Sequence, residues 1–214
     1  MFENVQKVEK KIGNSVLSIE TGKIAKQADG SVIVRYGETV VLVAVVTAPA
    51  RENIDYFPLS VDYRERHFAA GKFPGGFIKR EGRPTTKETL TARMIDRPIR
   101  PLFPENYFQE VQITSNVLSY DGENEPDVLA MIGASAALHI SKVPFIGPMG
   151  ACRISYLNDN FIINPGHEDM EAAEMNLILG GTDKAINMIE VDSKEVSAQV
   201  VEDAVKKGDE VDKD

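Results

Sequence analysis

The sequence predicts a single α+β domain, and three observations lead to this prediction. Short runs rich in β-branched residues recur along the chain, longer segments between them carry helical patterns, and no linker, repeat or low-complexity stretch separates them before the end. The chain has 214 residues, of which 43% are hydrophobic and 27% are charged, as is typical of globular proteins rather than disordered ones. A chain of this length can bury a sizeable core.

The first half of the chain is expected to form a β-meander. Two β-branched runs, 31–36 and 39–47, are separated by Gly37 and Glu38, a pair that favours a hairpin turn. The second run is apolar at both odd and even positions, which predicts a central strand covered on both faces. Further strands are expected at 15–25, 59–68, 111–120, 151–157, 161–164, 176–179 and 185–191.

The first helix is expected directly after a glycine-rich loop, residues 70–84. Thr85 and Glu88 have the spacing of a capping box, in which each side chain binds the backbone amide of the other residue. Pro98 and Pro101 should end this helix, because proline lacks the amide hydrogen that a helix interior needs.

Two more helices complete the expected elements. The second is expected over 126–141, with a proline in its first turn and small side chains along one flank that would let it pack closely on a sheet. The third is expected over 193–207, with Ser193 as its N-cap. We therefore place one domain at 1–207 and expect the acidic residues 208–214 to form a frayed tail, or the point where a longer chain was cut.

Membrane and disulfide-based classes are not expected. The longest aliphatic run, 40–46, is far shorter than the roughly 20 residues that cross a bilayer, and the first ten residues lack the apolar stretch of a signal peptide. Cys152 is the one cysteine in the sequence, so neither an internal disulfide framework nor a thiolate zinc site is expected. These features predict a soluble cytoplasmic protein.

Positive charge is concentrated in one stretch of an acidic chain. Residues 64–100 contain ten basic and four acidic side chains, a net charge of +6. The rest of the chain therefore carries a net charge of −15, which gives −9 for the whole sequence. Because glycine and proline interleave with the charges, we favour a shaped anion-binding loop over a solvated helix face with salt bridges. The basic residues are Arg64, Arg66, Lys72, Lys79, Arg80, Arg83, Lys87, Arg93, Arg97 and Arg100.

The residues from Phe73 to Phe103 read FPGGFIKREGRPTTKETLTARMIDRPIRPLF. This segment closely resembles the first RNase PH-like domain of the polynucleotide phosphorylases (polyribonucleotide nucleotidyltransferases). The resemblance extends over nearly the whole chain, weakens after about Val191, and does not include the terminal GDEVDKD. Other segments that carry it are TVVLVA, FPLSVDYRER, EPDVLAMIGASAALHISKVPFIGPMGACRI, NDNFIINP and LILGGTDKAINMIE.

The resemblance implies both a fold and a larger enzyme. The implied fold is a mixed sheet packed with helices, as in ribosomal-protein-like βαβ domains. The implied enzyme is a homotrimeric ring whose chains also carry a second RNase PH-like domain and KH and OB-fold modules. Its implied activity is processive 3′-to-5′ phosphorolysis of RNA in mRNA degradation, which uses inorganic phosphate, releases nucleoside diphosphates and is assisted by magnesium or manganese.

The resemblance also places an aromatic and basic RNA-binding loop at Phe77, Ile78, Lys79 and Arg80. Aromatic faces and cationic groups suit single-stranded nucleic acid, so we expect contact with single-stranded RNA, without sequence reading and without specificity for DNA. Relatives often have phenylalanine and arginine where this chain has Ile78 and Lys79, so apolar contact replaces stacking and the bidentate fork is lost. The alternative is a surface loop that Glu81 holds in place.

Four more arginines match positions at the mouth of the ring or at the interface between the two RNase PH-like domains. They are Arg83, Arg93, Arg97 and Arg100. RNA contact and internal ion pairing are equally expected for Arg93 and Arg97, with Asp96 as the partner of Arg97, whereas Arg100 is expected to contact RNA.

The chain lacks the catalytic residues that the resemblance implies. In the active copy of the domain a serine-containing loop holds phosphate, and a metal-binding aspartate precedes a lysine by two residues. Here Asn176 and Ile178 occupy the latter two positions, and the stretch from Pro148 to Ala151 contains no serine. A neutral amide is a poor ligand for a hard cation, and isoleucine cannot stabilise phosphoryl charge. We therefore expect no catalytic residue and no metal site in this chain.

The whole chain has three interpretations. It is a fragment of a phosphorolytic exoribonuclease that guides RNA, a free-standing RNA-binding or scaffold protein, or a complete nuclease that acts as a ring subunit. Asn176 and Ile178 count against a complete nuclease. The abrupt end after Lys207 favours a longer protein over a free-standing one.

Overall fold

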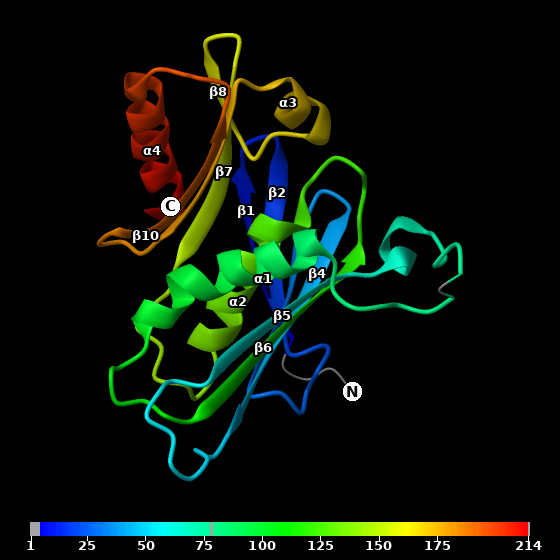
Figure 1. The fold of residues 1–214 in the computed structure, drawn as a ribbon, viewed down its shortest axis with the longest axis vertical. Helices are drawn as coiled ribbons and strands as arrows, with labels where there is room; N and C mark the ends of the chain where they lie inside the picture. The colour runs from blue at the N-terminus through cyan, green and yellow to red at the C-terminus, as the bar shows by residue number, and fades with distance from the viewer. Residues whose placement is uncertain (1–4, 78, 214) are drawn as a thin grey trace.

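A computed structural model describes residues 5–77 and 79–213, and its strands form two sheets (Figure 1). The larger sheet has the order β1-β2-β3-β4-β6-β5, in which neighbouring strands are antiparallel except for the parallel pair β5 and β6. Its strands are β1 (Gln6–Ile12), β2 (Ser15–Thr21), β3 (Gly30–Tyr36), β4 (Thr39–Ala48), β5 (Leu59–Glu65) and β6 (Glu110–Ser119).

The smaller sheet is antiparallel throughout and has the order β10-β9-β7-β8. Its strands are β7 (Gly150–Leu157), β8 (Asn160–Ile163), β9 (Met175–Gly181) and β10 (Ile186–Ser193). The chain therefore has the mixed α+β architecture that the sequence predicts.

Four α-helices and two short 3₁₀ helices accompany the sheets in the described ranges. They are α1 (Thr86–Ile99), α2 (Pro126–His139), α3 (His167–Ala172), α4 (Ala198–Lys213), η1 (His67–Ala70) and η2 (Arg100–Leu102). Helix α1 packs on β5, α2 packs on β3 and β4 and also reaches β7, and α4 packs on β7 and β9 (Figure 1). Within the described residues, no helix combines the length and the apolar character that crossing a membrane requires.

Helix α2 joins the two sheets because its small side chains permit close packing. A Cβ atom at Gly133 would lie 2.6 Å from Cγ2 of Val43 and 3.0 Å from Cγ2 of Val34, so the helix rests almost directly on the larger sheet. On the same helix, Met131 lies beside Gly180 of the smaller sheet. The predicted small-residue flank is therefore confirmed, and it places α2 between the two sheets.

Local sequence signals predict several elements correctly. The hairpin at Gly37 forms as expected, with Tyr36 opposite Thr39. The capping box is also present: the Glu88 amide donates to Oγ1 of Thr85 over 3.1 Å, and the Thr85 amide donates to Oε2 of Glu88 over 2.6 Å.

The prediction that β4 is covered on both faces is wrong. Val41, Val43 and Val45 are fully buried beneath α2, but Val46 on the opposite face is 47% exposed. Leu42 on that face is half-buried. The apolar sequence of β4 therefore indicates a central position in the sheet and does not indicate that both faces are covered.

The predicted third helix and frayed tail are wrong in their limits. Ser193 ends β10 and does not cap a helix, and α4 begins at Ala198 and continues to Lys213. Gly208 permits the continued helix to pack closely on the smaller sheet, because a Cβ atom there would come within 2.2 Å of Cδ1 of Leu179. Residues 208–213 are thus a packed turn of helix.

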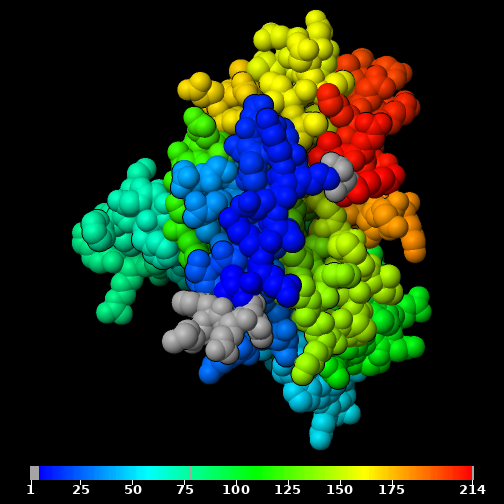
Figure 2. Space-filling model, turned by 180° about the vertical axis from the view of Figure 1, so that it is seen from behind, coloured from blue at the N-terminus to red at the C-terminus, as the bar shows by residue number. Residues whose placement is uncertain are grey.

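Strand β1 and helix α3 are elements that the sequence does not predict. Nearly every residue of β1 is exposed, and the strand crosses the back of the molecule as an edge of the larger sheet (Figure 2). Its lysine-rich sequence lacks the apolar alternation by which a half-buried strand is recognised. Helix α3 has only six residues, too few to show a helical period.

Candidate nucleic-acid interface

The predicted RNA-binding loop projects from the body of the protein between η1 and α1 (Figures 1 and 2). The side chain of Phe77 is fully exposed, and Lys79, Arg80 and Arg83 are also exposed. None of these three cations has an ion pair or side-chain hydrogen bond with the described part of the chain. Ile78 lies outside the described residues. The loop therefore presents an aromatic ring and uncompensated positive charge to solvent.

Glu81 anchors this loop to η1. Its Oε1 accepts a hydrogen bond from the His67 amide over 3.1 Å, and its Oε2 lies 3.2 Å from Nδ1 of His67. The hydrogen bond from the His67 side chain is the main reason that the pKa of Glu81 lies below its ordinary value. The expected alternative, a loop held by Glu81, is confirmed as an anchor, but this anchor leaves Lys79 and Arg80 free of partners among the described residues.

Arg100 forms bonds within the chain, which the sequence does not predict, and the expectation that it contacts RNA stays a prediction. Its guanidinium binds the Asp96 carboxylate at 2.7 and 3.1 Å. The same group donates to the carbonyl oxygens of Phe57 at 3.1 Å and Leu59 at 3.2 Å. Arg100 therefore fastens the end of α1 to the start of β5.

Arg97 is also paired, although not as predicted. Its guanidinium lies 2.9 Å from Oε2 of Glu190 in β10, whereas Asp96, the expected partner, binds Arg100. Arg93 is exposed and has no such partner in the described part of the chain. Of the cations predicted to bind RNA, those without a partner among the described residues are therefore Lys79, Arg80, Arg83 and Arg93.

A charged network lies behind the loop and fixes the ends of several elements. The ammonium group of Lys87 lies 3.1 Å from a carboxylate oxygen of Glu65 and 3.1 Å from one of Glu125. Burial disfavours the charge of Lys87, but the two carboxylates outweigh it and raise the pKa of this lysine. The hydroxyl of Tyr120 donates to Glu125 over 3.0 Å, and burial together with that carboxylate raises the pKa of Tyr120 to about 12.

The two degenerate catalytic positions are used for structure. Oδ1 of Asn176 accepts a hydrogen bond from the Ser155 hydroxyl, and its amide nitrogen donates to the Met170 carbonyl over 3.0 Å. Ile178 is 6% exposed and belongs to the core between the smaller sheet and α2. In the described part of the chain, no group of three or more His, Cys, Asp or Glu residues is placed to hold a metal ion. These positions therefore do not fit the divalent cation that the resemblance implies.

The stretch expected to replace the phosphate loop is also occupied internally. The amide of Met149 donates to Oγ of Ser135 over 2.7 Å, and the Met149 side chain is buried. Two acidic residues around the start of α2 also have partners within the chain. Asp127 forms a buried ion pair with Arg153, and Asp121 accepts hydrogen bonds from the backbone amides of the loop that precedes α2.

The residues around the charged network of Lys87, Glu65 and Glu125 were not predicted to form a site. Arg66, Lys72 and Lys87 belong to the predicted basic stretch but have no predicted role, and Tyr120 has none either. The signal that could have identified these residues is their position along the strands. Glu65 ends β5 and Tyr120 directly follows β6, and the ends of parallel strands are where α/β proteins gather ligand-binding groups. The parallel pairing itself is not visible in the sequence.

Solved structures share the fold of this chain. The structure of an archaeal exosome core matches 98% of this chain and 83% of its own, with a TM-score of 0.67 and 15% identity. The Archaeoglobus fulgidus exosome with RNA bound to the active site matches with a TM-score of 0.68 and 16% identity, over 99% of this chain and 86% of that one. At such low identity the likeness shows the fold alone, and this fold is the RNase PH-like one.

The sequence then gives the family. Residues 16–144 match the model of the 3′ exoribonuclease family, domain 1, and residues 147–211 match that of domain 2 of the same family. The first match covers most of the larger sheet with α1 and α2, and the second covers the smaller sheet with α3 and most of α4. The chain belongs to the 3′ exoribonuclease family.

Curated relatives carry one common name, polyribonucleotide nucleotidyltransferase, which confirms the resemblance drawn from the sequence. The proteins of Rhodopseudomonas palustris, Maricaulis maris and Persephonella marina are 52%, 54% and 52% identical, over 94%, 90% and 94% of this chain. The matched parts make up 28%, 27% and 28% of those relatives. The chain thus spans a little more than a quarter of their length.

Proposed function

We propose that this chain is the first, non-catalytic RNase PH-like domain of a polyribonucleotide nucleotidyltransferase, and that it guides single-stranded RNA. The observation that carries the proposal is the projecting loop, in which an exposed Phe77 stands beside cations that have no partner in the described part of the chain. Aromatic side chains that stack on bases and cations that neutralise phosphates are the two components of single-strand binding.

The loop would bind the strand through its shape and charge. Lys79, Arg80 and Arg83 neutralise phosphates, so affinity falls as salt rises, and Phe77 supports a base of any identity. Arg93 lies on the first helix after the loop and extends the same charge. Arg97 and Arg100 are left out of the contact set, because their guanidinium groups are used within the chain.

Catalysis would take place elsewhere in the full-length enzyme. There a phosphate oxygen would attack the phosphorus of the 3′-terminal phosphodiester, and the bond from that phosphorus to the 3′ oxygen of the preceding nucleotide would break. The displaced 3′ oxygen takes up a proton, so the products are a nucleoside diphosphate and a shortened RNA with a 3′ hydroxyl. We place this step, and the magnesium or manganese that assists it, in the second RNase PH-like domain, because Asn176 and Ile178 are packed within this one. KH and OB-fold modules, a homotrimeric ring and a cytoplasmic location complete the proposal.

The degenerate positions also support a second candidate, a free-standing RNA-binding scaffold. The reading frame beyond residue 214 distinguishes the two candidates: a second similar domain supports the enzyme, and a stop codon supports the scaffold. In both cases this chain alone should not release ADP from poly(A) in the presence of phosphate. Phosphate-dependent release by a preparation free of host enzyme would disprove the assignment of a non-catalytic domain.

Binding is tested by fluorescence anisotropy with labelled oligo(A) and oligo(U) over a series of salt concentrations. The variant Lys79→Ala/Arg80→Ala should bind both about ten-fold more weakly at low salt and show a shallower salt dependence. The matched control, Lys142→Ala/Lys184→Ala, removes the same charge from two lysines at the surface elsewhere and should change affinity less than about two-fold. Equal affinities for the two double variants would remove the loop from the proposal.

A further inference from the structure

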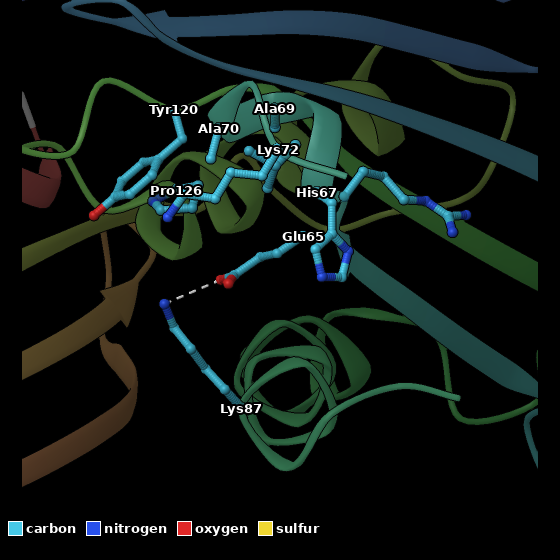
Figure 3. A pocket seen from close by; sticks show the side chains of 10 residues that line it. Glu65, His67, Ala69, Ala70, Lys72, Lys87, Tyr120 and Pro126 are labelled. Atoms are coloured by element: carbon cyan, nitrogen blue, oxygen red, sulfur yellow. Dashed lines mark ion pairs between the residues drawn. The ribbon is translucent and has the colours of Figure 1, made fainter. Parts of the chain in front are cut away.

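A cavity of about 180 Å³ opens at the base of the RNA-binding loop (Figure 3). It lies where the parallel strands β5 and β6 end, and it is bounded by η1 and by the first turns of α1 and α2. The crevice at the carboxyl ends of parallel strands is where α/β sheets bind ligands. We call this cavity the η1 pocket.

The floor and walls of the η1 pocket are apolar and fixed in place. Ala69, Val117 and Pro126 contribute apolar surface, and the backbone amide of Tyr120 donates to the Ala69 carbonyl over 3.0 Å. The Tyr120 ring lines one side, and its hydroxyl is held by Glu125. The pocket is therefore preorganised, with an aromatic ring whose position is set from both ends of the residue.

The charges around the η1 pocket favour an anionic ligand. Glu65 lines the pocket, but its carboxylate already binds Lys87. Arg66 and Lys72 also line it, and neither has an ion pair or side-chain hydrogen bond with the described part of the chain. Arg66 interacts electrostatically with Glu81 without forming an ion pair, so Lys72 is the less compensated of the two cations. Two helices begin at its edge, and helix N-termini add partial positive charge.

This combination matches a nucleotide within a strand better than it matches a peptide or a free ion. An apolar space of about 180 Å³ suits a flat heterocycle, and the cations that line it suit the phosphates on either side of that base. The pocket also belongs to the same chain segment as the loop, because Lys72 precedes Phe77 by five residues. A strand held by the loop would therefore pass the opening.

We propose that the η1 pocket receives one unstacked base of the RNA strand, with Tyr120 against the base and Lys72 and Arg66 on its flanking phosphates. The proposal rests on the RNA-binding function of the loop and adds a base subsite to it. Asn176 and Ile178 do not line this pocket, so the subsite is separate from the degenerate catalytic positions.

The first test fills the pocket. Ala70 is an exposed residue of its wall, so Ala70→Trp should occupy the space without disturbing the core, and Ala50→Trp places the same ring on an exposed loop elsewhere. We expect Ala70→Trp to weaken oligo(A) binding at least about five-fold, the lower range for loss of one stacked base, and Ala50→Trp to leave it unchanged. Equal affinity for Ala70→Trp and the unmodified protein would overturn the proposal.

The second test leaves the protein unchanged. A series of oligonucleotides, each with one abasic position, should show one position at which the missing base weakens binding at least about five-fold. A 2-aminopurine at that position should change its fluorescence on binding to the unmodified protein and not on binding to Ala70→Trp. A uniform abasic series would overturn the subsite even if Ala70→Trp failed to fold.

The two proposals fail in different ways. If Lys79→Ala/Arg80→Ala binds weakly while Ala70→Trp and the abasic series show no effect, the loop function stands and the η1 pocket is not a subsite. If the loop variant binds as well as the unmodified protein, the RNA-binding function itself fails.

Discussion

The loop at residues 71–84 and strand β9 are the two segments for which the sequence resemblance implies functional counterparts, and they differ in how their polar groups are used in the fold. In the loop, one carboxylate, Glu81, makes the side-chain anchor, and the neighbouring cations face solvent. In β9, Asn176 is bonded on both sides and Ile178 is buried. Side chains that face solvent without internal partners remain able to bind a ligand. Side chains that are buried or hydrogen-bonded within the chain are not available to one.

The largest effect is expected in β9. Replacing Ile178 by Lys, the residue that the resemblance implies for the active domain copy, would bury a charge in the core and lower the free energy of unfolding by at least about 3 kcal/mol. Urea denaturation measures this loss, and Ile178→Val, the control, should cost about 1 kcal/mol. A stable Ile178→Lys variant would mean that the side chain at position 178 can reach solvent, and it would contradict the buried role assigned to this position.

Helix α4 closes the other face of β9 and β7, and it carries a pH dependence. Both carboxylate oxygens of Asp212 are buried. Burial raises the pKa of Asp212 to about 7, and the neighbouring Cys152 thiol offsets only part of this rise. In the unfolded chain an aspartate titrates near about 3.9, so the folded state binds the proton more tightly. This group therefore lowers stability as pH rises from about 4 to about 7, after which its effect is constant.

Asp212→Asn tests that dependence. The variant should be more stable than the unmodified chain at pH 8, by about 1–3 kcal/mol, and the difference should nearly vanish at pH 4. Thermal unfolding at the two pH values measures it, with the exposed Glu210→Gln as a control that should show no such change. A constant difference between Asp212→Asn and the unmodified chain at both pH values would refute the assignment to Asp212.

Within the basic stretch, Arg100 and Arg83 provide the same contrast on a smaller scale. Arg100→Ala removes bonds to Asp96 and to two carbonyl groups at the protein surface, so it should lower the free energy of unfolding by about 1–2 kcal/mol and leave RNA affinity unchanged. Arg83→Ala should do the reverse, weakening RNA binding about two- to five-fold with little effect on stability. Loss of affinity in Arg100→Ala at full folding would return this residue to the contact set.

Sequence and structure agree where the signal is local. The capping box of Thr85 and Glu88 and the turn at Gly37 depend on neighbours within a few residues, and both form as predicted. In contrast, Arg97 pairs with Glu190, and Arg100 donates to carbonyl groups at the start of β5. These partners are far away in sequence. An arginine can be recognised in a sequence, whereas its partner is a property of the fold.

The same distinction explains the missed helix end and the missed pocket. The sequence after Lys207 is acidic and poor in apolar residues, which is typical of a frayed tail, but Gly208 lets the helix contact Leu179 and Ile154. The η1 pocket requires β5 and β6 to be parallel neighbours, although 44 residues separate the end of β5 from the start of β6. Neither contact has a signature in the local pattern.

The smallest effect is expected for the anchor of the loop itself. Glu81→Gln keeps the size of the side chain but weakens the bonds to His67, so the loop should sample more conformations and RNA binding should fall about two- to three-fold. The charge change alone acts in the opposite direction, because removing a negative charge beside Lys79 and Arg80 should strengthen binding to phosphates. Anisotropy titrations at low and high salt separate the two effects, since salt screens the charge effect and leaves the loss of order. Tighter binding by Glu81→Gln at both salt concentrations would show that Glu81 only reduces the positive charge of the loop and does not position it.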